Sequence, residues 1–307
     1  AGALRAMVDT PFELIACMFA IGVGFNVMMP SIPKVFGQWF PLDKLAFVNG
    51  ISMAGAGLGA AIATATAASL LSPALGGWRG VMLAMGAVVF AGGILWILVY
   101  RDPKEETPHP EKKPRLLDNF KLVSKVKDIW LMSALFCFLT LGFMPLGAFL
   151  PISFQERGLA HAGELAAVFM AVSVIFNVVG GRISDKIGRR KPILIIGTAV
   201  SGLCVLTYSS LSGPPLILML IIAGAGIGAL APVLFTMPIE MKEIGPELAA
   251  TAVGFMMIFQ SVSGFLGPII TGKLIDVTGS NLAGFIFMGG AVIIAAVFAI
   301  PLKETGR

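Results

Sequence analysis

Charged side chains are scarce in this chain of 307 residues, and their scarcity excludes an ordinary soluble domain. Asp, Glu, Lys and Arg make up 13% of the residues, which is roughly half the share found in soluble proteins. Hydrophobic residues make up 57%, and the mean hydropathy is +0.91. Apolar runs of about 20 residues, each long enough to cross a bilayer as a helix, recur along the chain. The composition therefore predicts an all-α integral membrane protein.

Residues that could form a catalytic, metal or nucleotide site are also few. Cys17, Cys137 and Cys204 lie inside apolar runs without C-x-x-C spacing, so we interpret them as packing residues. His109 and His161 have no metal-site companion, and no nucleotide-binding G-x-x-x-x-G-K-[ST] pattern occurs. A membrane enzyme that acts on lipid would need a catalytic His, Asp or metal cluster, and we identify none. We expect no enzyme activity, no cofactor and no metal site.

Nine apolar runs divide the chain into two parts. Proline and glycine separate the runs, as Pro30 and Pro33 do after the first. The segment 101–128 is rich in proline and in both charges and reads as a linker, whose last part from Leu116 to Asp128 resembles an amphipathic helix. We expect a partial first bundle at 1–100, this linker, and a six-helix bundle at 129–307. The expected spans are 11–33, 45–70, 79–100, 129–154, 163–181, 192–211, 215–238, 247–272 and 281–301.

The positions of lysine and arginine predict the orientation. When the loop 181–191 is placed in the cytoplasm, only Arg5, Arg79, Arg157 and Lys273 fall outside. Cations concentrate on the cytoplasmic side of membrane proteins. We therefore expect an N-terminus outside, a cytoplasmic C-terminus and a place in the cytoplasmic membrane. The net charge of +5 then reports this orientation, and no nucleic-acid partner is expected.

A long internal repeat is a second signal. The shift that aligns Gly22 with Gly226 also aligns Gly50 with Gly254, without a gap. Each match alone is weak because glycine is common here, but the shared offset makes the first three spans copies of the last three in the same orientation. Residues 129–204 have no upstream counterpart under this shift.

The polar stretch between the fifth and sixth spans carries the most specific pattern. Its five cations would hold it on one side of the bilayer, but that role does not require Asp185. An acid at this place can pair with the neighbouring cations or face the positive end of a helix. The pattern is G-x-x-x-D-K-x-G-R-R, formed by Gly181, Asp185, Lys186, Gly188, Arg189 and Arg190.

This spacing resembles the cytoplasmic signature loop of the major facilitator superfamily, whose halves each contain six helices. Gly77-Trp78-Arg79, Pro238-Ile-Glu240 and Gly264-x-x-Gly267-Pro268 are similar to its cyanate and nitrate permease and organic anion branches. The resemblance implies that the first three of twelve helices are absent, in a fragment or in a natural nine-span protein. It also implies that the halves rock about a midplane cavity while the loop stabilises one closure, with Asp185 as pivot and Arg189 and Arg190 as its partners. The alternative is that the loop only sets orientation.

The implied function is secondary active transport of a small solute, such as a small organic or inorganic anion, by alternating access in a monomer. Coupling to a proton or another ion follows from the family, although no acid lies in the middle of a span. Met18 stands where related branches often have arginine, which argues against anion recognition by these spans. The alternative is a truncated, non-transporting homologue with a structural or sensing role.

Uncharged polar residues deep within the spans are the remaining candidates for the transport cavity. An amide in hydrocarbon needs a hydrogen-bond partner or a water-filled cavity. For Gln260 we favour contact with the substrate. Hydrogen bonding between helices is the competing interpretation for each of these residues. The substrate-cavity candidates are Gln260, Thr140, Phe143, Phe259 and Met256. The gate candidates are Asn26, Asn177 and Glu240.

Overall fold

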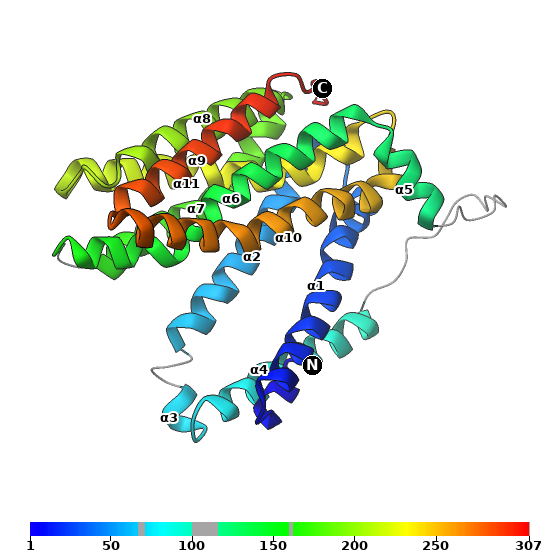
Figure 1. Ribbon diagram of the computed structural model, residues 1–307. Coiled ribbons are helices and arrows are strands. Elements are labelled where there is room, and N and C mark those ends of the chain that lie inside the picture. Colours follow the sequence, from blue (N-terminus) through cyan, green and yellow to red (C-terminus); the bar gives the residue numbers. More distant parts are fainter. Residues whose placement is uncertain (67–70, 100–115, 160–161, 307) are drawn as a thin grey trace. The chain divides into compact units, whose positions relative to one another are not determined.

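The computed structural model describes residues 1–66, 71–99, 116–159 and 162–306, and all its regular elements are helices (Figure 1). This confirms the all-α class. Short helices are η1 (Ala3–Met7), η2 (Leu42–Lys44), α3 (Ser72–Ala74) and α5 (Leu116–Ser124). Long helices coincide with each of the nine expected spans: α1 (Pro11–Trp39), α2 (Leu45–Thr66), α4 (Trp78–Val99), α6 (Lys127–Glu156), α7 (Ala162–Ile187), α8 (Lys191–Thr207), α9 (Gly213–Glu240), α10 (Gly245–Thr278) and α11 (Asn281–Ala299).

Seven helices of the described chain are long and apolar enough to cross a membrane. Two shorter apolar segments complete the set. They are Leu45–Ala60, which is the first part of α2, and α8 at Lys191–Thr207. A helix of 17 residues rises about 25 Å, slightly less than the hydrocarbon core of a bilayer. The apolar runs therefore located the helices, whereas helix length varies around the bilayer thickness.

Proline does not end the first long helix as expected. The first span was predicted to end at residue 33, but α1 continues through Pro30 and Pro33 to Trp39. Likewise α9 contains Pro232 and Pro238 inside its length. A proline removes one backbone donor, and membrane helices tolerate this loss where neighbouring groups satisfy the freed carbonyl. The first part of the linker, 101–115, lies outside the described residues. The amphipathic helix expected in its last part is α5, which ends at Ser124 and not at Asp128.

The described residues form two compact units, each of two chain segments. The first unit comprises Ala1–Ser31 and Gly55–Lys113, and the second comprises Ile32–Ala54 and Pro114–Arg307. Within the first unit, η1 packs on α4, where the Gly86 backbone lies against Ala3. The expected domain boundaries at 100 and 128 stay a prediction.

The second unit is built around helices α6 to α11, drawn from green to red in Figure 1. Helix α7 packs on α9, α6 packs on α10 and α11, and α8 packs on α9 and α11. Large buried side chains fill the bundle, among them Phe154, Phe169, Tyr208 and Phe285. Glycine permits the closest approaches, as at Gly228, whose backbone lies against Ser173 of α7.

The six helices alternate in direction, so their termini gather at two ends. One end holds the starts of α6, α8 and α10 and the last residues of α7, α9 and α11. We call it the ion-pair end because the buried ion pairs described below lie there. The other end, with Arg157 and Asn281, is called the opposite end.

Candidate functional site

The signature stretch is mainly helical. Helix α7 was predicted to end at residue 181, but it continues to Ile187 because Gly181 and Ser184 lie three positions apart on its buried face. Gly188 ends the helix with a φ of 67°, and its N–H donates to the Ser184 carbonyl at 3.0 Å. Glycine is the residue that adopts this left-handed conformation without strain. The turn to α8 is therefore short, and it directs Arg190 into the protein.

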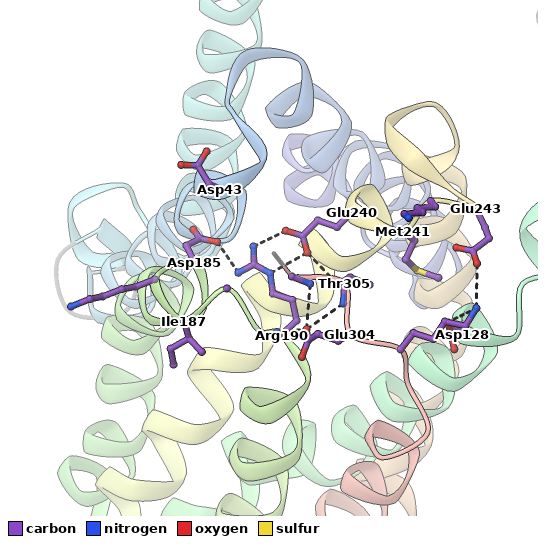
Figure 2. Close-up of a pocket in the computed structure, with 15 residues that line it drawn as sticks. Asp43, Asp128, Asp185, Ile187, Arg190, Glu240, Met241, Glu243, Glu304 and Thr305 are labelled. Atoms are coloured by element: carbon purple, nitrogen blue, oxygen red, sulfur yellow. Dashed lines mark hydrogen bonds and ion pairs between the residues drawn. The ribbon is translucent and has the colours of Figure 1, made fainter.

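Arg190 is the buried centre of the site, with 2% of its surface exposed. Its Nη1 lies 2.7 Å from Asp185 Oδ1, and Nη2 and Nε donate to the two Glu240 oxygens at 2.6 and 3.1 Å. Figure 2 shows the guanidinium between these two carboxylates. Burial lowers the pKa of Arg190, but the hydrogen bonds and charges of Glu240 and then Asp185 outweigh it, so the pKa is raised. Arg190 therefore stays charged, and it joins α7 to the last residue of α9.

Asp185 links this ion pair to the start of α2. Its Oδ2 accepts a hydrogen bond from the Phe47 N–H at 2.8 Å, in the first turn of that helix. A carboxylate is stabilised there by unpaired amides and the positive end of the helix dipole. The Asp185 side chain, 9% exposed, thus serves both functions that the sequence left open: it pairs with a cation and caps a helix.

Two glycines bring α2 close enough to α7 for this cap. The Gly181 backbone lies against the Ala46 carbonyl, and the Gly50 backbone lies against the Asn177 carbonyl. A β-carbon at either glycine would overlap these backbone atoms. Because backbone cannot move as a flexible side chain does, both positions require glycine for contact at this distance.

The other signature residues lie at the surface. Lys186 and Arg189 are exposed, and among the described residues it is Arg190 that pairs with Asp185. The Arg182 guanidinium lies 5.8 Å from the centre of the Phe47 ring, a cation–π contact with the same turn of α2. The stretch therefore separates into a buried set that binds α2 and α9 and an exposed set of cations.

The gate candidates lie in different surroundings. Asn26 and Asn177 each donate to the carbonyl four residues earlier in their own helix, Gly22 at 2.8 Å and Ser173 at 3.0 Å. Glu240 is instead part of the ion-pair cluster. Asn26 belongs to the first compact unit, whereas Asn177 and Glu240 belong to the second. Of the three gate candidates, Glu240 is the one that forms a direct ion pair with a signature residue, Arg190, among the described contacts.

The cavity candidates do not share one environment. Thr140 on α6 is buried and faces Gly264 of α10, one turn after Gln260, which is half-buried. Phe143 packs against the buried core beside Phe169. Phe259 contacts Trp130 near the start of α6. Met256, also on α10, is 1% exposed. Thr140 therefore faces α10 at a position one turn from Gln260.

A cavity of about 660 Å³ opens at the ion-pair end. Ten charged side chains contribute to its lining, and Figure 2 shows Arg190 among several of the carboxylates. Lys303 reaches Glu243 at 3.2 Å and lies 4.0 Å from Asp128. The acidic residues that line the cavity are Asp43, Asp128, Asp185, Glu240, Glu243 and Glu304.

Sequence reasoning missed two sets of residues here. Asn49 is fully buried, and its Nδ2 donates to Thr236 Oγ1 at 3.0 Å, which joins α2 to α9 beside the ion pairs. An amide inside an apolar run was an available signal for Asn49. Glu304 and Thr305, which also contact the cluster, follow the last span, and no motif marked them.

Comparison with known proteins decides the family. The model of the Major Facilitator Superfamily matches residues 1–166 and 155–307. The chain belongs to the major facilitator superfamily. It is therefore a multi-pass membrane protein and a transporter of a small solute, as the signature spacing indicated.

Individual relatives and a solved structure agree with this assignment. A putative tartrate transporter of Agrobacterium vitis is 27% identical over 98% of this chain and 75% of the relative. A nitrite extrusion protein of Bacillus subtilis is 28% identical over 96% of this chain and 72% of the relative. The crystal structure of the Escherichia coli fucose:proton symporter FucP shares the fold, with a TM-score of 0.71 and 15% identity over 90% of this chain and 73% of that one.

Proposed function

We propose that this superfamily member moves a small anion across the cytoplasmic membrane by alternating access. The observation that carries the anion class is the similarity over nearly the whole chain to proteins named for nitrite and tartrate. Both solutes are oxyanions, with oxygen atoms that accept hydrogen bonds. The proposed orientation, with the C-terminus in the cytoplasm, is supported by the concentration of lysine and arginine in alternate loops.

The proposed cytoplasmic gate is the contact between Asp185, Arg190 and the start of α2. The Phe47 N–H and the Arg190 guanidinium hold the two oxygens of Asp185 at 2.8 and 2.7 Å. Opening at this end would separate α2 from α7, expose these polar groups to water and break both interactions. Buried ion pairs add little net stability because desolvation offsets their attraction, so water entry can exchange them at modest cost. Such a contact favours one closed state without making it permanent.

Substrate recognition is assigned to neutral hydrogen-bond donors. Charged residues of the nine long helices lie within two turns of a helix end, and a charge at the bilayer centre would be costly. Gln260 offers amide N–H donors and Thr140 a hydroxyl, on the neighbouring helices α10 and α6. Neutral donors bind an oxyanion more weakly than arginine does, which suits a site that must release its ligand on both sides.

The test of substrate class is uptake by the purified chain in liposomes. Nitrite, nitrate and tartrate are offered separately, with fucose as the sugar control, and thermal stability is measured with each solute. We expect uptake of at least one of the three anions and none of fucose. Fucose uptake without anion uptake would contradict the anion class, and the absence of all uptake would support the non-transporting alternative.

The recognition residue is tested by Gln260→Ala, with Gln155→Ala at an exposed position of α6 as the matched control. The loss of a hydrogen bond to a charged ligand should weaken binding by roughly ten- to hundredfold. We expect the KM for the transported anion to rise in Gln260→Ala and to stay unchanged in Gln155→Ala. Equal KM values in both variants and the wild type would remove Gln260 from the site.

A further inference from the structure

The five residues that follow α11 and its closing turn lie across the ion-pair end. We call Leu302–Gly306 the strap. Leu302 is 2% exposed and anchors the strap in the bundle. From there the strap reaches the turn between α7 and α8 and the end of α9, the two places that hold Arg190 and Glu240 (Figure 2).

Glu304 supplies a cap that α8 lacks locally. Arg190 is the N-cap residue of α8, and its own side chain makes no capping hydrogen bond. Glu304 Oε1 instead accepts the Arg190 N–H at 2.6 Å, and Oε2 lies 3.3 Å from the Lys191 nitrogen. A carboxylate at a helix start is stabilised by the unpaired amides and the helix dipole. Glu304 therefore fixes the backbone of the residue whose guanidinium pairs with Asp185.

Thr305 fixes the other partner of that guanidinium. Its hydroxyl donates to Glu240 Oε2 at 3.1 Å, the oxygen that also accepts from Arg190 Nε. Next along the chain, the Gly306 backbone lies against the Gly188 carbonyl, and a β-carbon at Gly306 would overlap that atom. Consecutive strap residues thus hold the backbone of Arg190 and orient the carboxylate that binds its side chain.

We propose that Glu304 and Thr305 are positioning residues for Arg190. By positioning Arg190, the strap sets how firmly Asp185 holds the start of α2. This inference rests on the proposed gate, in which release of the Phe47 N–H accompanies opening. A series of hydrogen bonds and ion pairs joins the strap to α2: Thr305 donates to Glu240, Glu240 binds Arg190, Arg190 forms an ion pair with Asp185, and Asp185 accepts from Phe47. Lys303 contributes little to the series because its side chain is 70% exposed.

Hydrogen exchange of the full-length protein in liposomes tests the strap, read on the peptide that contains Phe47. The variants are Thr305→Val and Glu304→Ala, with Thr305→Ser as the conservative replacement that keeps the hydroxyl and Lys303→Gln as the control. Loss of one hydrogen bond changes an equilibrium by about three- to tenfold. We expect exchange at this peptide to accelerate by about that factor in the first two variants and to match the wild type in the other two.

Asp185→Asn serves as the reference because it alters the gate itself. Faster exchange in Asp185→Asn together with wild-type exchange in Thr305→Val and Glu304→Ala would overturn the strap and leave the gate standing. Wild-type exchange in Asp185→Asn would overturn the gate, and the strap with it. Thr305→Val preserves the size of the side chain, so a folding defect is not expected, and the exchange of α6 in the same samples verifies this.

Discussion

At the ion-pair end of the bundle Arg190 lies between two carboxylates, whereas at the opposite end Arg157 donates to two backbone carbonyls. Arg157 Nη1 and Nη2 lie 2.6 and 2.5 Å from the carbonyl oxygens of Tyr208 and Leu211. Those acceptors are neutral and close the end of α8. The partners of Arg190 are charged, buried and drawn from α7 and α9.

Under the proposed gate, this difference separates a fixed contact at Arg157 from an exchangeable one at Arg190. Without Arg157, two neutral carbonyls near the surface can bind water. Without Arg190, Asp185 and Glu240 would be left as two neighbouring buried carboxylates, which is a much larger penalty. Under the proposed alternating access, a contact that must break and re-form is well served by charges that water can stabilise in the open state, and a contact that holds two helices of one bundle together is well served by carbonyls.

The largest effect is expected from Arg190→Gln. Removal of one partner from a buried ion pair costs about 3–5 kcal/mol, so we expect a clear fall in melting temperature and loss of uptake. Arg189→Gln, at the exposed neighbouring position, is the matched control and should behave as the wild type. Thermal unfolding in detergent and uptake in liposomes measure both variants. An unchanged melting temperature in Arg190→Gln would contradict the buried role.

A smaller effect is expected from Gly181→Ala, which adds a β-carbon against the Ala46 carbonyl. Overpacking of this kind costs about 1–3 kcal/mol, and the helices must separate to admit the methyl group. We expect faster hydrogen exchange at Phe47 and a lower melting temperature. Gly163→Ala provides the control on the same helix, since nothing lies within 4 Å of its added β-carbon. Identical exchange in the two variants would show that α2 and α7 need no close contact.

Arg157→Gln should sharpen the comparison between the two ends. Lost hydrogen bonds at a half-buried site should cost about 1 kcal/mol, without any effect on the start of α2. We expect a modest fall in melting temperature and wild-type hydrogen exchange at Phe47. Accelerated exchange at Phe47 in this variant would mean that the two ends are coupled and that the distinction between them is wrong.

Lys303→Gln should have the smallest effect. Its contacts with Glu243 and Asp128 are made by a side chain that is 70% exposed, and exposed ion pairs contribute at most about 1 kcal/mol. We expect a melting temperature close to that of the wild type, with a difference that disappears in high salt. A large, salt-independent loss of stability would place Lys303 among the buried determinants.

The sequence located the helices well because apolar runs and a membrane-spanning length are local properties. The spacing of the signature stretch also predicted Arg190 as a partner of Asp185, and the two side chains lie 2.7 Å apart, although Asp185 lies within α7 and not in a loop. The helix ends were less predictable: α7 extends six residues beyond the expected end at 181, because Gly181 and Ser184 continue its buried face in a segment that reads as polar. Proline misled in α1, where neighbouring groups in a membrane helix can replace the lost hydrogen bond.

The partners of the site could not be derived from the sequence. Asp185 meets the main-chain N–H of Phe47, and every residue except proline carries such a group, so no side-chain pattern announces it. Glu304 caps α8 from more than a hundred residues away, a distance over which local pattern carries no information. The Asn49–Thr236 hydrogen bond likewise depends on which faces of α2 and α9 meet.

Uptake by liposomes containing the wild type or Asp185→Asn tests the central claim most directly. The solute is whichever of nitrite, nitrate and tartrate the wild type takes up, and its binding is followed by thermal shift in the same preparations. The account predicts uptake by the wild type, and a large loss of uptake with retained binding of the same anion in Asp185→Asn, since the substitution alters the gate and leaves Gln260 untouched. Uptake at the wild-type rate by Asp185→Asn would contradict it.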